Sequence, residues 1–354
     1  MELRSPLSIV AAMGIVALLL FGIHFLLGGF SPAEKSSSPP EVGISPSGEK
    51  YPIAPELAGI EGYINTSPPF TLSSLKGKVV IVDFWTYSCI NCIRTQPYLN
   101  AWYDRYHAEG LEIIGVHTPE FDFEKKIDNV EAAVEKAGIR YPVVLDNAYA
   151  TWNAYGNRYW PRKYLVDAEG FIRYDHIGEG GYEETEKMIQ ELLSERNEAL
   201  METGLVSPEL GENTPAPTYG QNRTPELYFG YAFARAPLGN EEGYQPDATV
   251  DYSLPASPPP NLISLEGKWE NHSDYMELAG EEGKIVLPYA AAQVNIVASG
   301  PGILIPSLDG IAQSPIEVGE ETLYTIIGGE THASHTLTMD INGKGFRIYT
   351  FTFG

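Results

Sequence analysis

The chain has 354 residues, 43% of them hydrophobic, which is typical of a globular protein and long enough for two domains. Its formal net charge of −24 argues against a nucleic-acid partner or binding to an anionic lipid surface, because both repel an acidic protein. The acidic excess is therefore interpreted as a solvated surface.

An uncharged apolar run, Leu7–Phe30, lies near the start of the chain, and about 20 such residues span a bilayer. Arg4 precedes the run and the next basic residue is Lys35, which favours a cytoplasmic segment 1–6 and an extracytoplasmic remainder. A cleaved signal peptide is the alternative, although its apolar region usually has only about 7–15 residues. The sequence thus predicts a single-pass anchor in the cell membrane, with the soluble domains outside.

The segment 31–50 is rich in Pro, Ser and Gly and is predicted to be a flexible tether. Segment 51–200 then alternates strand and helix patterns, which predicts an α/β domain whose last strands are antiparallel. Its predicted elements are strand Gly77–Trp85, a helix from the cysteines to Ala108, strand Leu111–Val116, helix Glu124–Lys136, strand Val143–Leu145, helix Tyr149–Tyr155, a hairpin of Lys163–Val166 and Phe171–Ile177, and helix Tyr182–Glu198.

After residue 200 the composition changes, and the Pro/Gly-rich segment 201–223 is predicted to be a linker. Segment 224–354 contains short β-type runs separated by Gly and Pro, which predict an all-β, jelly-roll-like sandwich. Asn342-Gly343 between the last two runs predicts a hairpin turn. The runs are Leu227–Phe233, Tyr275–Leu278, Lys284–Tyr289, Gln293–Ala298, Gly302–Ile305, Leu323–Ile327, His335–Ile341 and Phe346–Phe353.

The only two cysteines, Cys89 and Cys92, form a C-x-x-C pair at the junction of a predicted strand and helix. In an oxidising compartment a structural disulfide gains most by closing a long loop, whereas this pair closes only a tight turn. A structural zinc site needs four ligands; there is no second cysteine pair, and neither His107 nor His117 has a paired-ligand spacing. The pair therefore indicates thioredoxin-type redox chemistry, with no metal.

Each group near the pair can be given a role. The helix N-terminus favours the thiolate of Cys89, which attacks a disulfide, and Cys92, one turn further on, resolves the mixed disulfide. Asp83 lies in an apolar strand, where burial would raise its pKa and suit it to take the proton of Cys92. A partly exposed acid at the strand end is the alternative.

Several strings carry a resemblance to a known family. VDFWTYSCINC (82–92) resembles the thioredoxin pattern, with Asp83 six residues before the first cysteine and Pro97 eight after it. Four longer strings resemble the TlpA-like thioredoxin domain of the DipZ proteins: FWTYSCINCIRTQPYLNAWYDRY (84–106), GVHTPEFDFE (115–124), YWPRKYLVDAEG (159–170) and GEGGYEETE (178–186). TPELYFGYA (224–232) and YTFTFG (349–354) resemble the DipZ C-terminal domain, a β-sandwich likened to carbohydrate-binding modules.

The resemblance covers about residues 55–354 and implies a thioredoxin-like fold, with Asp83 as a buried proton acceptor. It also implies that Pro161 follows a cis peptide bond and faces the disulfide; an ordinary trans proline at a strand start is the alternative. Trp85, Tyr87 and Trp160 are expected to bind substrate around Cys89, although any of them could belong to the core. DipZ carries a CcdA-like electron-relay domain where this sequence has one anchor, so a membrane electron donor of the CcdA or DsbD type is an expected partner.

The sequence therefore predicts a membrane-anchored, extracytoplasmic thiol:disulfide oxidoreductase that acts on protein disulfides through Cys-Ile-Asn-Cys and needs no cofactor. The C-terminal domain is expected to be a separate unit without chemistry of its own. The competing hypothesis is a surface-binding protein whose β-sandwich binds a glycan or a partner protein. Four aromatic residues could form a stacking face for sugars or could equally be core: Trp269, Tyr275, Tyr289 and Tyr324.

Overall fold

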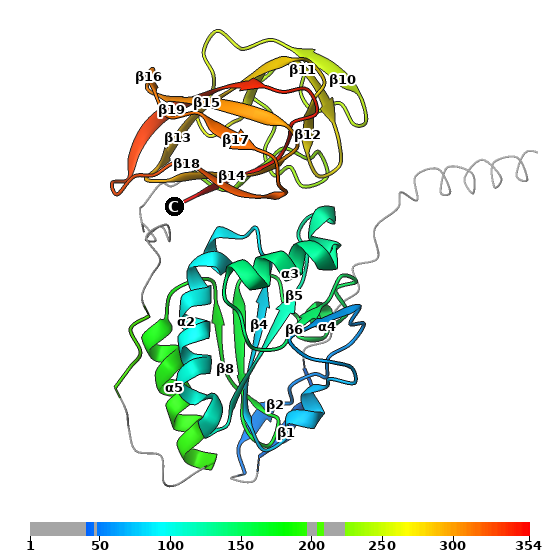
Figure 1. Ribbon diagram of the computed structural model, residues 1–354, viewed down its shortest axis with the longest axis vertical. Helices are drawn as coiled ribbons and strands as arrows, with labels where there is room; N and C mark the ends of the chain where they lie inside the picture. Colours follow the sequence, from blue (N-terminus) through cyan, green and yellow to red (C-terminus); the bar gives the residue numbers. More distant parts are fainter. Residues whose placement is uncertain (1–39, 46–47, 197–203, 209–223) are drawn as a thin grey trace, which may run out of the picture. The chain divides into compact units, whose positions relative to one another are not determined.

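The computed structural model describes residues 40–45, 48–196, 204–208 and 224–354 (Figure 1). The predicted anchor lies outside these residues, as do 31–39 and 46–47 of the predicted tether and all of the predicted linker except 204–208. The prediction of a flexible tether is wrong for Val42–Ile44, which form a strand that pairs with Lys50–Pro52. Within the described ranges, no helix is long and apolar enough to cross a membrane. The described residues from Pro40 onward belong to one compact unit.

A six-stranded sheet forms the centre of the N-terminal domain, with the strand order β3-β6-β5-β4-β7-β8. The three middle strands β4, β5 and β6 are parallel, and β3, β7 and β8 join them in antiparallel pairs, which confirms the predicted α/β fold and its final hairpin. The strands are β3 (Gly62–Ile64), β4 (Val79–Trp85), β5 (Leu111–His117), β6 (Val143–Leu145), β7 (Arg162–Val166) and β8 (Ile172–Ile177). Strands β1 (Val42–Ile44) and β2 (Lys50–Pro52) form a separate two-stranded ribbon.

Alternation along β4 divides the domain into two cores. Val79, Ile81 and Trp85 belong to one hydrophobic cluster, while Val80, Val82 and Phe84 belong to the other, as the two-residue period of a strand requires. The first face is covered by α2 (Ile90–Tyr106), α3 (Ile127–Lys136) and α5 (Tyr182–Arg196), and the second by α4 (Ala150–Ala154) and the 3-10 helix η1 (Leu72–Leu75). Two further 3-10 turns are η2 (His107–Glu109) and η3 (Asp122–Lys125).

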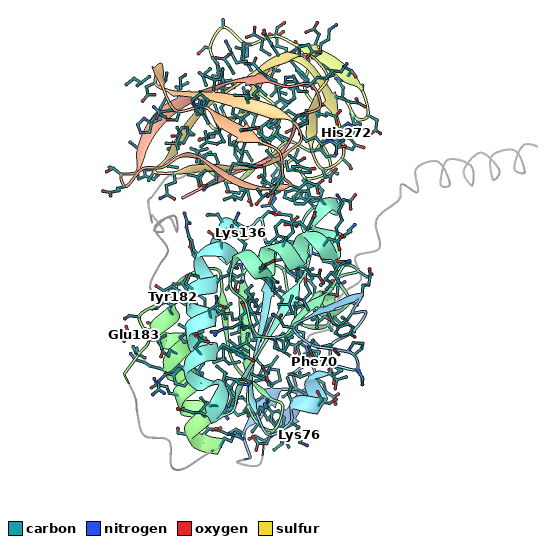
Figure 2. All side chains as sticks on the ribbon, in the orientation of Figure 1. Phe70, Lys76, Lys136, Tyr182, Glu183 and His272 are labelled. Carbon is teal, nitrogen blue, oxygen red and sulfur yellow. The ribbon has the colours of Figure 1, made fainter. Side chains whose placement is uncertain are left out.

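Helices α2 and α5 lie side by side against the sheet (Figure 1). Tyr182 at the start of α5 (labelled in Figure 2) stacks on Tyr98 of α2. Further along the two helices, the hydroxyl of Tyr106 donates a hydrogen bond of 2.7 Å to Glu186. Pro97 lies within α2, and Gly110 (φ 110°) ends the segment after η2. The cysteine-bearing helix is thus fixed along its length.

The C-terminal domain consists of twelve strands in one antiparallel sheet, which confirms the all-β prediction (Figure 1). The strands are β9 (Leu227–Tyr228), β10 (Thr249–Tyr252), β11 (Ser264–Asn271), β12 (Met276–Leu278), β13 (Glu282–Ala291), β14 (Val294–Ser299), β15 (Gly302–Leu308), β16 (Ile311–Ala312), β17 (Ile316–Val318), β18 (Thr322–Ile327), β19 (Ala333–Asn342) and β20 (Arg347–Phe353).

Strand β11 joins the two halves of this sheet. Residues 264–266 pair with β13, whereas residues 267–270 pair with β10, and the change occurs at Gly267 (φ 94°), a conformation that favours glycine. Side chains from both halves form one hydrophobic core, so the sheet folds over on itself instead of forming two separate sheets. The hairpin predicted at Asn342-Gly343 is wrong, because β19 pairs with β13 and β15 while β20 pairs with β9, β12 and β14.

The two domains share a hydrophobic cluster, which contradicts the expectation that the C-terminal domain stands apart. The ring of Tyr349 lies 5.1 Å from Phe121 and 4.8 Å from Phe123. Arg94 of α2 donates a hydrogen bond of 3.0 Å to Gln293. An aromatic core with a buried polar contact at its edge is typical of a stable interface between domains, and not of domains that are joined only by a linker.

Tyr349→Ala is expected to lower the free energy of unfolding by about 3 kcal/mol, because the ring is almost completely buried in this shared cluster. The matched control is Tyr231→Ala in the same domain, which removes a surface tyrosine and should change stability by less than about 0.5 kcal/mol. Guanidinium unfolding of the two variants measures the difference. Equal losses would contradict the shared cluster.

Candidate active site

Cys89 and Cys92 lie where the sequence predicts, at the start of α2 directly after β4. Cys89 is the N-cap residue of the helix, and the backbone N–H of Cys92 donates a hydrogen bond of 3.4 Å to its sulfur. Both thiols are free; Cys89 is half-buried, whereas Cys92 is only 1% exposed. Burial and the hydrogen bond with Cys89 raise the pKa of the Cys92 thiol well above its usual range. A substrate can therefore reach Cys89 but not Cys92.

Asp83 lies beneath the cysteine pair, on the face of β4 that α2 covers. It is 1% exposed, and neither carboxylate oxygen has a hydrogen-bond partner among the described residues. Burial raises the pKa of Asp83 to about 6, although the charge of Lys163 opposes the shift. The charge of Asp83 in turn contributes to the raised pKa of Cys92. The predicted burial of Asp83 next to Cys92 is thus confirmed.

Lys163 is a second buried charge that the sequence prediction missed. It lies on β7 directly opposite Asp83 in the strand register and is completely buried. Its ammonium group is 3.5 Å from the carbonyl oxygen of Gly178. Burial lowers the pKa of Lys163, while the charges of Asp83 and Cys92 raise it. The sequence feature that could have revealed this residue is a lysine at an inward-facing position of the strand RKYLV.

Glu124 positions the residue before the nucleophile, and it too was missed. Its fully buried carboxylate accepts hydrogen bonds from the hydroxyl of Ser88 at 2.6 Å and from the backbone N–H of Ser88 at 3.3 Å. It also accepts one from the N–H of Phe121 at 3.0 Å. Burial raises the pKa of Glu124. The loop after β5 is thereby tied to the loop that carries Cys89.

Glu124→Ala is expected to slow disulfide exchange about tenfold, because the loop before Cys89 loses its anchor and buried donors are left unpaired. Glu124→Gln keeps one acceptor oxygen and should recover part of the rate. Glu131→Gln, an exposed acid on α3, is the charge control. Stopped-flow exchange rates with thermal unfolding of each variant test this. A stability loss without a rate loss would mean that Glu124 has no role in positioning Cys89.

The three aromatic residues predicted to bind substrate differ in position. Trp160 is half-buried, faces the same cavity as Cys89 and donates a hydrogen bond of 3.0 Å to the carbonyl of Thr118. Trp85 and Tyr87 are buried and pack against His117 at centroid distances of 5.2 and 5.7 Å, so they support the site from within. The Trp160–Pro161 peptide bond is cis, as the resemblance implies, and Pro161 is buried.

A cavity of about 250 Å³ opens in front of Cys89 and has walls from both domains. The N-terminal domain contributes Ser88–Asn91, Glu120 and Arg158–Trp160. The C-terminal domain contributes residues that the sequence prediction missed: Glu226, Tyr228, Arg235, Val297, Thr350, Thr352 and Phe353.

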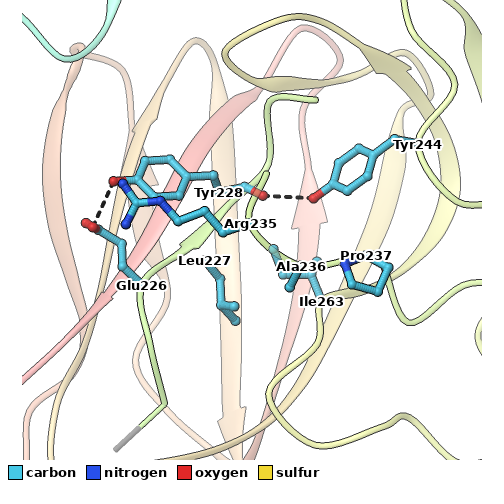
Figure 3. A pocket seen from close by; sticks show the side chains of 8 residues that line it. All are labelled: Glu226, Leu227, Tyr228, Arg235, Ala236, Pro237, Tyr244 and Ile263. Atoms are coloured by element: carbon cyan, nitrogen blue, oxygen red, sulfur yellow. Dashed lines mark hydrogen bonds between the residues drawn. The ribbon is translucent and has the colours of Figure 1, made fainter. Parts of the chain in front are cut away.

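The hydroxyl of Tyr228 joins the two walls of this cavity. It lies 2.6 Å from a carboxylate oxygen of Glu120 on the N-terminal side. On the C-terminal side it lies 2.8 Å from a carboxylate oxygen of Glu226, and the guanidinium of Arg235 lies 5.0 Å from the ring centre (Figure 3). Burial and the charge of Glu226 raise the pKa of Glu120. The phenol has a single proton, so its hydroxyl brings two carboxylates together at this wall of the cavity.

The four aromatic residues proposed as a sugar-stacking face do not form one. Trp269 and Tyr289 are buried in the core of the C-terminal domain. Tyr275 and Tyr324 are half-buried, and Tyr275 packs beside Tyr349 of the interdomain cluster at 5.3 Å. Core packing thus accounts for Trp269 and Tyr289.

Comparison with known proteins supports this reading of the two domains. Residues 54–175 match the AhpC/TSA family, and residues 224–354 match a family described as a thioredoxin-like C-terminal domain. Protein DipZ of Mycobacterium bovis is 41% identical over 309 residues, which are 86% of this chain but 43% of DipZ. The chain thus spans less than half the length of that relative.

Two further proteins resemble the N-terminal domain alone. The thiol-disulfide oxidoreductase ResA of Geobacillus thermodenitrificans is 34% identical over 119 residues, covering 31% of this chain and 66% of ResA. The crystal structure of the thioredoxin domain of a thiol-disulfide oxidoreductase from Bacteroides vulgatus is 26% identical, covers 44% of this chain and 99% of that domain, and has a TM-score of 0.30. The chain is therefore a homologue of DipZ, and its N-terminal domain is similar in sequence to named thiol-disulfide oxidoreductases.

Proposed function

We propose that the chain is a thiol:disulfide oxidoreductase in which Cys89 and Cys92 exchange two electrons with a substrate disulfide. The observation that carries the proposal is the asymmetry of the pair: an accessible Cys89 caps the helix, while a shielded Cys92 lies above a buried carboxylate. That arrangement supplies the nucleophile, the resolving thiol and a proton acceptor in one place.

Reduction of a disulfide takes two steps. The Cys89 thiolate attacks one substrate sulfur, and the other sulfur leaves as a thiolate that takes up a proton. Cys92 then transfers its proton to Asp83 and attacks the Cys89 sulfur, so the second substrate thiol leaves and the enzyme is oxidised to a Cys89–Cys92 disulfide. Two electrons pass from the enzyme to the substrate, and the same steps in reverse oxidise a dithiol.

Lys163 supports the proton transfer through its charge. A buried carboxylate alone would hold its proton and could not accept one from Cys92. The Lys163 ammonium lowers the pKa of Asp83 against the effect of burial, and it also favours the Cys92 thiolate that forms in the second step. Asp83 is then ionised at neutral pH and ready to accept.

The function is tested by reduction of insulin with dithiothreitol as electron donor. The wild-type chain is expected to accelerate the reaction and Cys89→Ser to return it to the uncatalysed rate. Equal rates for both proteins with insulin and with a small disulfide such as cystine would contradict the proposal. The glycan-binding form of the surface-binding alternative is weakened, because Trp269 and Tyr289 are packed in the core.

We also propose that Leu7–Phe30 anchors the enzyme in the cell membrane, with the catalytic domain extracytoplasmic. The length of the apolar run and the charges beside it support this. Disulfide-containing extracytoplasmic proteins and a membrane electron donor of the CcdA or DsbD type are the partners such a placement suggests. The chain should stay in the membrane fraction after an alkaline carbonate wash; release by the wash would contradict the anchor.

A further inference from the structure

We propose that the cavity in front of Cys89 binds a low-molecular-weight, amino-acid-derived disulfide and recognises both its carboxylate and its ammonium groups. This inference rests on the proposed function and specifies its substrate class. It rests on the size of the cavity, on its position over the nucleophile and on the charges of its walls.

The cavity suits a small molecule better than a protein. Its volume of about 250 Å³ lies just below the range of about 300–1,000 Å³ that is usual for small-molecule sites. A stable protein–protein contact needs about 800 Å² on each partner. Around Cys89, however, the C-terminal domain covers the surface with Tyr228, Thr352 and Phe353, where a folded substrate would have to dock.

The walls of the cavity carry charges of both signs. Arg158 and Arg235, one from each domain, are exposed and provide guanidinium groups that match a carboxylate. Glu120 and Glu226, whose carboxylates share the Tyr228 hydroxyl, place acidic oxygens at the cavity wall that can accept hydrogen bonds from an ammonium group. A zwitterionic ligand satisfies both, whereas a purely anionic or purely cationic one leaves a like charge beside it.

The chemistry also fits a small substrate. Attack of the Cys89 thiolate splits the disulfide, so that one half leaves as a thiol and only the other half remains in the cavity, bound through its sulfur. Cys92 then releases the second half. One disulfide becomes two small thiols, which take the protons from Cys89 and Cys92, and the two cysteines become the enzyme disulfide.

The experiment compares three disulfides with the reduced full chain: cystine, cystamine, which lacks the carboxylates, and dithiodipropionate, which lacks the ammonium groups. Stopped-flow rates are measured at an ionic strength of about 0.15 M, which screens the net charge of the protein beyond about 8 Å. Each rate is divided by the rate of the same disulfide with dithiothreitol, to remove differences in intrinsic reactivity. Cystine should then react about tenfold faster than either analogue.

Arg235→Ala should reduce the normalised cystine rate to that of cystamine, and Glu226→Gln should reduce it to that of dithiodipropionate. Arg105→Ala, which removes an arginine from the outer face of α2, should leave the ratios unchanged. Equal normalised rates for all three disulfides, together with reduction of insulin, would overturn this inference and leave the proposed function intact. Failure with every disulfide, insulin included, would overturn the proposed function itself.

Discussion

Cys92→Ser is expected to accumulate a mixed disulfide on Cys89, whereas Cys89→Ser should form none and should lose exchange activity by more than about 1,000-fold. The reason is access. Cys89 is half-buried at the helix N-terminus, while Cys92 is 1% exposed and can reach only a sulfur already attached to Cys89. Intact-protein mass spectrometry after incubation with a disulfide identifies the adduct and the residue that carries it.

The fold should tolerate these substitutions. Serine is a favourable N-cap residue, so Cys89→Ser keeps an acceptor for the backbone N–H of Cys92. Thermal unfolding of each variant close to that of the wild type would show that activity is lost through chemistry. If instead Cys89→Ser trapped the substrate and Cys92→Ser did not, the two roles would be reversed.

Asp83→Asn is expected to slow exchange at neutral pH by tenfold or more, because Cys92 loses its proton acceptor. In the wild type the pKa of Asp83 is about 6, so its carboxylate is ionised and able to accept a proton above that pH and is protonated below it. The rate of the resolving step should therefore rise as pH increases through about 6. In Asp83→Asn this rise should be absent.

Lys163→Met tests the same proton transfer through the charge that acts on Asp83. Removing the ammonium removes the charge that holds the pKa of Asp83 down, so the rise in rate should move to higher pH by about one unit or more. At neutral pH the variant should be slower than the wild type, and it should approach the wild-type rate in alkaline buffer. Asp104→Asn, an exposed acid on α2, is the control. An unchanged pH profile in Lys163→Met would remove this lysine from the mechanism.

Local signals made the centre of the site predictable. The two cysteines, Asp83 and the strand before them lie within eleven residues of sequence, VDFWTYSCINC, and the strand and helix patterns around them are strong. Lys163 and Glu124 were missed because each acts through a partner that lies far away along the chain. An inward lysine is recognisable only once Asp83 is known to lie opposite it, and Glu124 only once its loop is known to contact Ser88.

In the C-terminal domain, the sequence patterns failed to predict one strand, one connection between strands and the packing against the N-terminal domain. Strand β11 went unrecognised because Gly267 and alternating charged residues interrupt its apolar pattern. A Gly/Asn turn was assigned to a hairpin, although the segment after β19 crosses to the other half of the sheet. The Pro/Gly-rich linker suggested independence, but nothing in its composition reports the later packing of Tyr228 and Tyr349 on the N-terminal domain.

The central claim, that Cys89 and Cys92 act as one redox pair, is tested most directly by counting thiols in dithiothreitol and glutathione redox buffers. The reduced and oxidised forms are alkylated and counted by mass spectrometry. We predict that both thiols disappear together in a single two-electron transition, in which the ratio of oxidised to reduced protein changes tenfold for about 30 mV. The Cys89→Ser and Cys92→Ser variants should form no internal disulfide. Two thiols that stayed reduced over the whole range of about −270 to −120 mV, or that oxidised independently, would contradict the account.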